Sequence, residues 1–254
     1  MPAPATLAPL YDERYFKENY LASRAARLAH FRSLWARVAP LAPASLPGAP
    51  GRGRLLDVGC GPGFFLEVAA EHGWEAWGVE PSMAAEHVAR SLRAHVIRAP
   101  FGQDHLAHGS FDVVTFWDVL AHLPDAAPAL ERAGRLLRGG GLLVVKTPRL
   151  SPALAAAARL LGRRGRALLH VPQQVYHFTP AALHALCEAA GFEAPATSRV
   201  REVSRPVPPA PTLRRMLARF LARGAERLLN PHPSLLLVAR RGLAAGGLPQ
   251  VAGG

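Results

Sequence analysis

A short glycine-rich loop, DVGCGPG (residues 57–63), follows an aliphatic run and precedes a segment with helical periodicity. Glycine tolerates positive φ and lets main-chain N–H groups approach a ligand closely. Between a strand and a helix of a parallel sheet, such a loop lies at the carboxyl edge, where ligands bind. Its spacing is not that of a dinucleotide fingerprint, because Phe64 replaces the last glycine, and the G-K-[ST] of a P-loop is absent. The loop therefore predicts an α/β domain that binds a ligand through its main chain.

Short aliphatic runs alternate with helical segments from residue 54 onward. Strands are predicted at Arg54–Val58, Glu75–Val79, His95–Arg98, Phe111–Trp117, Gly141–Thr147, Phe192–Arg201 and Ser234–Arg240. Helices are predicted at Gly63–His72, Ser82–Leu92, Asp125–Leu137, Ser151–Leu161 and Pro180–Ala190. Strands that alternate with helices of this length form βαβ units. We therefore expect an α/β fold with a doubly wound, mainly parallel seven-stranded sheet that ends in an antiparallel strand.

Composition divides the chain into parts. Residues 1–50 are predicted to form an N-terminal helical cap and linker, because Tyr11–Leu41 has helical periodicity and a segment rich in proline and glycine follows it. Residues 51–241 form the main domain, with a basic amphipathic insertion at 205–232 before the last strand. The glycine- and alanine-rich tail, 242–254, is predicted to be disordered.

The formal charge of +12 is unevenly distributed: residues 1–150 carry 16 basic and 14 acidic side chains, and the rest carry 14 and 4. All but Lys17 and Lys146 of the 30 basic residues are arginine. Within the insertion, 212–229 places apolar residues on one face and arginines at spacings of four. This segment either packs on its own domain with a solvated basic face, contacts anionic lipid at a membrane surface, or forms a lid or dimer contact. The sequence leaves the oligomeric state open.

The cysteines and the N-terminal residues indicate the cellular compartment. Cys60 and Cys187 are the only cysteines and neither has a CxxC neighbour, so we expect free thiols in a reducing environment. No apolar run reaches the roughly 18 residues of a membrane span. The first residues lack the basic and apolar regions of an export signal. A cytoplasmic protein is therefore expected.

Five ordered blocks of the sequence resemble class I S-adenosylmethionine-dependent methyltransferases. They are DVGCGPG (57–63), VEPS (79–82), FDVVTFWDVLAHLPD (111–125), LLRGGGLLVVKTP (136–148) and FTPAALHALCEAAGFE (178–193). The likeness extends over roughly residues 10 to 241 and is to the small-molecule type, such as the ubiquinone-biosynthesis O-methyltransferases. The resemblance implies a Rossmann-like methyltransferase fold and S-adenosylmethionine as the cofactor.

The resemblance also implies which residues contact that cofactor. The three loop glycines approach its methionine and ribose parts, Asp57 organises the loop and the amino group, and Glu80 holds the ribose, since a carboxylate can accept from both hydroxyls. The acid that usually reads the adenine is missing or displaced in the segment 98–104, so Phe101 is expected to pack on that ring. The cofactor-binding residues predicted in full are Asp57, Gly59, Cys60, Gly61, Gly63, Glu80, Pro81, Phe101, Trp117 and Asp118.

Two histidines are candidates for substrate contact or general base. His122 follows the fourth strand, near the expected methyl group, and His177 lies in a loop that comes over the active site in relatives. Imidazole suits a base because its ordinary pKa is close to neutral pH. The alternative for each histidine is a structural role in packing. Ubiquinone-biosynthesis relatives have an acid-x-x-Glu-His stretch that holds a divalent metal, but Ala121 replaces the glutamate between Asp118 and His122 here, so no metal is predicted.

The function expected from these features is methyl transfer to a small-molecule acceptor, most simply at oxygen. The basic charge offers an RNA methyltransferase as an alternative, although the sequence shows no RNA-binding module and nucleic acid is not the expected partner. A catalytically inactive cofactor-binding partner protein is the other alternative, because the adenine acid and the glutamate at position 121 are missing.

Overall fold

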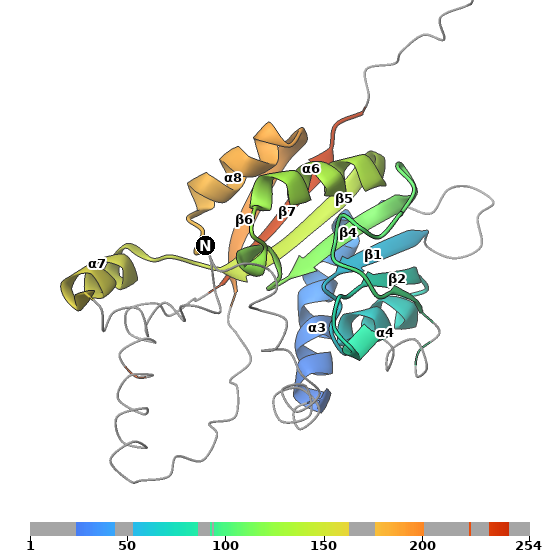
Figure 1. Cartoon of the computed structure of the whole chain (residues 1–254), viewed down its shortest axis with the longest axis horizontal. Helices are drawn as coiled ribbons and strands as arrows, with labels where there is room; N and C mark the ends of the chain where they lie inside the picture. The colour runs from blue at the N-terminus through green and yellow to red at the C-terminus, as the bar shows by residue number, and fades with distance from the viewer. Residues whose placement is uncertain are drawn as a thin grey trace, which may run out of the picture.

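A seven-stranded sheet in the order β3-β2-β1-β4-β5-β7-β6 forms the centre of the computed structural model (Figure 1). The structure describes residues 24–43, 53–85, 92, 94–162, 176–200, 224 and 234–243. The strands are β1 Arg54–Val58, β2 Glu75–Val79, β3 His95–Ile97, β4 Phe111–Trp117, β5 Leu137–Pro148, β6 Phe192–Val200 and β7 Ser234–Arg241. The pairs from β3 to β5 are parallel, whereas β7 pairs antiparallel with both β5 and β6. The predicted doubly wound, mainly parallel sheet is confirmed.

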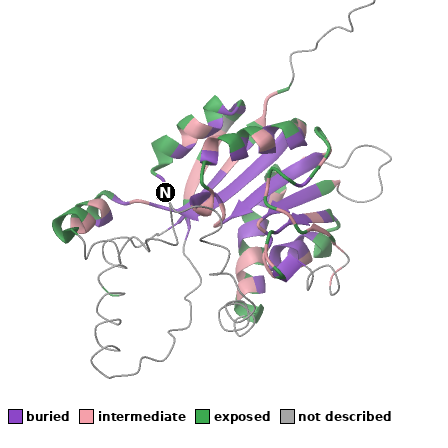
Figure 2. Ribbon diagram, viewed as in Figure 1, coloured by how far each residue is buried: buried purple, intermediate pink, exposed green. Residues whose placement is uncertain are grey.

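Helices cover both faces of the sheet (Figure 1). Helices α3 (Arg24–Val38) and α4 (Phe64–Glu71) lie on one face, and α6 (Ala126–Leu136) and α8 (Pro180–Ala189) lie on the other. Helix α7 (Pro152–Leu160) projects beyond the sheet, and two 3₁₀ turns, η3 (Ala39–Leu41) and η4 (Leu120–His122), complete the described elements. Figure 2 shows largely buried strands between helices that are buried mainly on their inner sides.

The sheet separates two hydrophobic clusters, because successive residues of a strand point to opposite faces. Val113 of β4 and Val144 of β5 contribute to the cluster under α3 and α4. Their neighbours Val114 and Val145 contribute to the cluster under α6 and α8. All four valines are fully buried. Central parallel strands that are covered on both faces read as continuous apolar runs, which explains why the sequence predicted them well.

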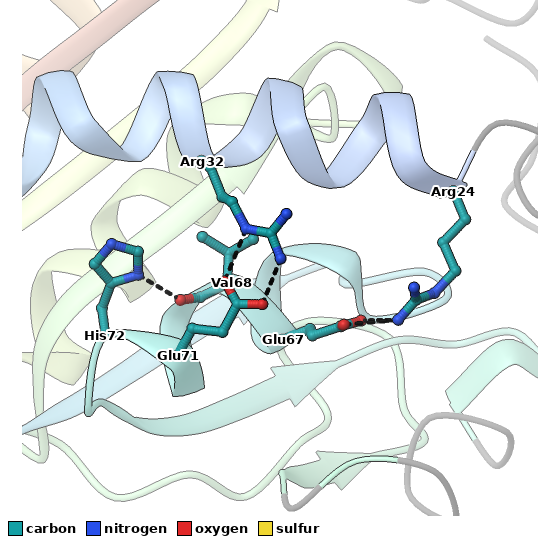
Figure 3. Close-up of polar contacts among 6 residues, drawn as sticks. All are labelled: Arg24, Arg32, Glu67, Val68, Glu71 and His72. Carbon is teal, nitrogen blue, oxygen red and sulfur yellow. Dashed lines mark hydrogen bonds and ion pairs between the residues drawn. The ribbon is translucent and has the colours of Figure 1, made fainter.

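Helix α3 belongs to the layer that covers the sheet. Trp35 is fully buried and its ring meets Phe65 of α4 edge-on at 5.6 Å. At the surface, ion pairs link α3 to α4: Arg24 to Glu67 and Arg32 to Glu71, with N–O distances of 2.6 Å (Figure 3). Helix α4 begins directly after the glycine loop, so α3 is fixed against the element that follows this loop.

Strand β5 begins earlier than the sequence predicted. It starts at Leu137, which pairs with Phe111, and the register then shifts so that Val113 pairs with Leu142. The residues between form an irregular segment in which Gly140 has a φ of 74°, a conformation that favours glycine. The third strand is shorter than predicted, since it ends at Ile97 rather than Arg98.

Helix starts follow the capping residues in the sequence. The side chains of Asp125, Ser151 and Thr179 accept hydrogen bonds from main-chain N–H groups of the first turns of α6, α7 and α8. Such caps satisfy donors that a helix leaves unpaired at its N-terminus. Gly191, directly after the last turn of α8, has a φ of 80°. These local signals explain why the predicted helix bounds agree closely with the observed ones.

Several predictions concern segments outside the described residues. These are the N-terminal part of the helical cap before Arg24, most of the predicted helix Ser82–Leu92, the tail after residue 243, and the insertion 205–232 apart from Gly224. The division into a cap of residues 1–50 and a domain of 51–241 therefore stays a prediction. Among the described residues, no helix is long and apolar enough to cross a membrane.

Candidate functional site

The glycine loop has the backbone conformation that its sequence predicted. Gly59, Gly61 and Gly63 have φ values of 68°, 50° and 79°, all in the region that favours glycine. The Gly59 N–H donates to the carbonyl of Val79 at 2.7 Å, which ties the loop to the end of β2. Gly63 is the N-cap of α4. Three positive-φ glycines at alternate positions thus bring bare main chain to the carboxyl edge of the sheet.

Glu80 connects this loop to the loop after β2. Its side chain is buried, Oε2 accepts from the Gly61 N–H at 3.0 Å, and Oε1 accepts from the Ser82 N–H at 2.9 Å. A carboxylate offers about four acceptor positions, so two remain after these bonds. The predicted role of Glu80 in holding a ribose diol fits this geometry. The neighbouring Pro81 is exposed and lies between the two bonded residues.

Asp57 lies beneath the loop, at the end of β1. It is only 3% exposed, and Thr115 Oγ1 of β4 donates to its Oδ1 at 2.7 Å. Burial raises the pKa of Asp57 to about 8; the Thr115 hydrogen bond opposes this shift, and the nearby Glu80 charge adds to it. The buried Glu80 carboxylate beside this loop favours a ligand that carries positive charge, which a sulfonium amino acid does. The residues present therefore fit the predicted cofactor.

Cys60 points away from the ligand side of the loop. A Cβ added to Gly78 of β2 would lie 2.6 Å from its Sγ, so the thiol fills the space beside that strand. Burial raises the pKa of the Cys60 thiol, and the charges of Asp57 and Glu80 raise it further. Any cofactor contact by Cys60 is thus left to its main chain. Cys60 and Cys187 are both buried and free.

The turn after β4 lies against the glycine loop. A Cβ on Gly59 would lie 2.5 Å from Cγ2 of Val119, so the two segments are in close contact. Asp118 has a φ of 60°, its Oδ2 accepts from Lys146 Nζ at 2.5 Å, and its N–H donates to the Lys146 carbonyl at 2.8 Å. Trp117 packs inward against Phe65, with ring centroids 4.8 Å apart. The predicted cofactor contact of Trp117 stays a prediction.

The two predicted histidines lie on segments that the structure brings together. His122 ends η4 and its N–H donates to the Val119 carbonyl at 2.8 Å. The segment that contains His177 runs beside this turn: Tyr176 N donates to the Ala121 carbonyl at 3.2 Å and Tyr176 Oη to the Pro124 carbonyl at 2.8 Å. Both histidines are partly buried. The described residues contain no group of three His, Cys, Asp or Glu side chains suited to a metal ion.

The displaced acid after β3 has a structural role. Asp104 pairs with Arg132 and accepts from the N–H groups of Gly102 at 2.7 Å and Leu106 at 3.2 Å. Burial acts to raise the pKa of Asp104, but the Arg132 and main-chain hydrogen bonds hold it below the ordinary value. Phe101 lies under the same guanidinium, at 5.5 Å from its ring centre. Contact of Phe101 with adenine stays a prediction.

Two polar residues of the site were missed by the sequence reasoning. Thr115 bonds Asp57, and Lys146 bonds Asp118. Each is a polar residue inside or at the end of an aliphatic run, FDVVTFW and GLLVVK, and both are buried. A buried polar residue needs a hydrogen-bond partner, so this position in the pattern was a usable signal.

The sheet order, the glycine loop after β1 and the acid after β2 define a class I methyltransferase fold, and S-adenosylmethionine is the cofactor of this class. Residues 21–196 match a protein family described as a methyltransferase domain. The chain therefore belongs to the methyltransferase-domain family.

Curated relatives are similar over part of their length. The ubiquinone biosynthesis O-methyltransferase of Alkalilimnicola ehrlichii is 37% identical over 114 residues, which are 42% of this chain and 46% of that protein. That of Xanthomonas campestris pv. campestris is 35% identical over 141 residues, 53% of this chain and 56% of that protein. The chain spans about half the length of these relatives.

Solved structures share the fold along most of the chain. A Mesorhizobium loti S-adenosylmethionine-dependent methyltransferase is 25% identical with a TM-score of 0.54, covering 82% of this chain and 97% of that one. A SAM-dependent methyltransferase from Archaeoglobus fulgidus has a TM-score of 0.60 at 17% identity, covering 87% and 99%. The second similarity is one of fold alone.

Proposed function

We propose that this protein transfers a methyl group from S-adenosylmethionine to an oxygen atom of a small-molecule acceptor. The observation that carries the proposal is the bonding of buried Glu80 to Gly61 within a loop of three positive-φ glycines. Similarity to ubiquinone biosynthesis O-methyltransferases over about half their length supports oxygen as the acceptor atom.

In this proposal the chain binds and orients the reacting groups. Gly59, Gly61 and Gly63 present main chain to the methionine part of the cofactor, Glu80 accepts from the ribose hydroxyls, and Asp57 fixes the loop from beneath. When bound, the cofactor supplies an activated methyl group on its sulfonium sulfur. Alignment of an acceptor with such a group is worth up to about 7–11 kcal/mol. His122 and His177 are the proposed acceptor contacts at the carboxyl edge.

Calorimetric titration with S-adenosylmethionine and S-adenosylhomocysteine tests cofactor binding. The Gly61→Val variant should lose binding, because its side chain would occupy space beside the ligand and strain a φ of 50°. Gly109→Val is the matched control, since Gly109 has a φ of 62° with no atom within 4 Å of an added Cβ. Wild-type affinity in Gly61→Val, or no binding by the folded wild-type protein, would contradict the proposal.

The acceptor is found by incubating the protein with radiolabelled cofactor and a cell extract. We expect the label in a small molecule, as a methyl ether or ester. Label in RNA would favour the alternative that the charge of +12 suggests. Cofactor binding without transfer to any fraction would favour an inactive partner protein, an alternative supported by the engagement of Asp104 with Arg132.

A further inference from the structure

A buried lysine lies beside the site and takes no part in the cofactor contacts above. Lys146 is 3% exposed and lies near the end of β5, directly opposite Trp117 of β4. Its Nζ donates to Asp118 Oδ2 at 2.5 Å, and its carbonyl accepts from the Asp118 N–H at 2.8 Å. These two contacts join the end of β5 to the turn after β4.

The second carboxylate oxygen of Asp118, Oδ1, has no hydrogen-bond partner among the described residues in this arrangement. Oδ1 is shielded from solvent and accepts no hydrogen bond within the described part of the chain. A buried acceptor without a partner costs about 1–3 kcal/mol, and more if it is charged. Asp118 also has a φ of 60°, a region in which aspartate is enriched among non-glycine residues. The unpaired Oδ1 points to a ligand that donates a hydrogen bond to it.

The surroundings of Asp118 restrict which ligand this is. The next residue, Val119, fills the space beside Gly59 of the cofactor loop. The segment with His177 contacts the same turn through Ala121 and Pro124. Asp118 therefore belongs to a turn that touches both the proposed cofactor loop and the proposed acceptor side, which is where a reacting hydroxyl must lie.

We propose that Asp118 and Lys146 form a catalytic pair that activates the hydroxyl of a phenolic methyl acceptor, an inference that rests on the function proposed above. Asp118 Oδ1 takes the hydroxyl proton, while the Lys146 ammonium donates to the same oxygen. The oxygen forms a bond to the methyl carbon, and the C–S bond breaks with its electron pair passing to sulfur. The products are a methyl ether, S-adenosylhomocysteine and protonated Asp118, which then releases its proton to water.

Charge balance favours this division of roles. Before the reaction the ammonium pairs with the carboxylate, and after proton transfer it pairs with the phenolate. The pair thus keeps one positive and one negative charge, so no isolated charge is created at the Lys146 ammonium, whose side chain is 4% exposed beside a 35% exposed Asp118. A phenol has a pKa near 10, so a carboxylate and an ammonium together can ionise it, whereas an aliphatic alcohol is a far weaker acid. The pair therefore selects phenolic acceptors.

Lysine suits this position better than arginine does. The chain uses arginine for 28 of its 30 basic residues, and Lys146 is one of the two exceptions. An ammonium is compact and directs three donors to separate partners, whereas a guanidinium is planar and larger. A single ammonium can therefore serve a carboxylate and a hydroxyl at once.

Substitutions at the pair test the inference. Asp118→Asn and Lys146→Met should each lower kcat by about 10²-fold or more, the scale of a preorganised donor at a developing charge, while calorimetric cofactor affinity is unchanged. Lys146→Met should also move the kcat–pH profile to higher pH, because the phenolate loses its ammonium. Lys146→Arg should restore the profile in part. Asp112→Asn is the control: Asp112 is a buried acid at the other end of β4, ion-paired to Arg138 at 2.9 Å, and its loss should leave kcat unchanged.

A binding measurement gives a readout that needs no turnover. 4-Nitrophenol, whose anion is coloured, is titrated into the complex with S-adenosylhomocysteine. We expect the wild-type complex to ionise the bound dye at lower pH than the Lys146→Met complex does. Equal ionisation in both complexes, or no binding of the dye to the wild type, would contradict the inference.

The outcomes separate this inference from the proposed function. If the wild-type protein does not bind the cofactor, or if the label is found on nitrogen or carbon, both the proposed function and the catalytic pair are contradicted. An active wild type whose Asp118→Asn and Lys146→Met variants keep kcat defeats the pair alone. Weakened cofactor binding in Asp118→Asn assigns Asp118 to the cofactor, as the sequence predicted, and removes it from acceptor activation.

Discussion

Asp57 is a single buried acid, and its burial raises its pKa to about 8. In the unfolded chain an aspartate titrates near 3.9. Between these values the folded protein holds a proton that the unfolded chain releases, so stability falls as the pH rises from about 4 to about 8. Asp57→Asn removes this titration, so unfolding at a series of pH values should find the stability of the variant rising relative to wild type, by about 1.4 kcal/mol per pH unit across this range.

Asp104→Asn should change stability with pH in the opposite direction. The pKa of Asp104 is lowered, so its carboxylate contributes stability at neutral pH that is lost as the pH falls through its folded value. This variant should be less stable than wild type at pH 7, with a difference that shrinks toward acid pH. A difference between Asp57→Asn and wild type that stays constant from pH 4 to 8 would show that Asp57 does not hold a proton in the folded protein.

The hydrogen-bond partners of the site residues show which parts of a site can be predicted from the sequence. The loop glycines and Glu80 were predicted because their signals are local. The Thr115–Asp57 bond joins residues 58 apart, and the Lys146–Asp118 bond joins residues 28 apart. Such pairs depend on which strands become neighbours and in which register, and neither is encoded by spacing along the chain.

At the scale of elements, the attachment of α3 to α4 shows which contacts hold a helix in place (Figure 3). Arg32 and Glu71 are 48% and 37% exposed, and exposed ion pairs contribute about 0–1 kcal/mol. Trp35 is fully buried between Phe65 and Trp74. We expect Arg32→Ala to change the free energy of unfolding by less than about 1 kcal/mol, and Trp35→Ala to lower it by about 3–5 kcal/mol. Urea denaturation measures both; equal effects would mean that the ion pairs, rather than the core, attach α3.

Element bounds were predictable where one local rule decided them. β1, β2 and β4 have the predicted bounds, because each is an apolar run closed by glycine or charged residues. β5 was not predicted from its true start, since a run of three glycines after Arg138 normally indicates a turn. Its first residue is fixed instead by pairing with Phe111, and Arg138 is fixed by its ion pair to Asp112. Both partners lie far away in the sequence.

On the scale of the whole molecule, parallel strands bring the site residues to one edge. The loops after β1 and β2 and the turn after β4 all leave the sheet at its carboxyl ends, so Gly61, Glu80 and Asp118 gather although they are spread over the sequence. The topology of a doubly wound sheet thus predicts the place of the site. It does not predict the acceptor, because one fold supports many different activities.

The uneven charge of the whole chain supports a last prediction, that segment 212–229 binds anionic membrane surfaces. After residue 150 there are 14 basic and 4 acidic side chains, and this segment has arginines at spacings of four beside an apolar face. The protein should sediment with vesicles containing phosphatidylserine at low salt, and it should be released at about 1 M salt, where the Debye length is near 3 Å. It should not sediment with vesicles of phosphatidylcholine alone.

Replacement of Arg215, Arg219 and Arg223 by glutamine should abolish this sedimentation, because each basic residue near an anionic surface contributes about 1 kcal/mol. The matched control replaces Arg24, Arg32 and Arg37 of α3 by glutamine and removes the same charge from another helix. If both triple variants lose binding equally, the attraction comes from net charge, and the segment has no special part in it. If the wild type fails to sediment even at low salt, the apolar face of 212–229 belongs to the protein's own core or to a contact between copies of the chain.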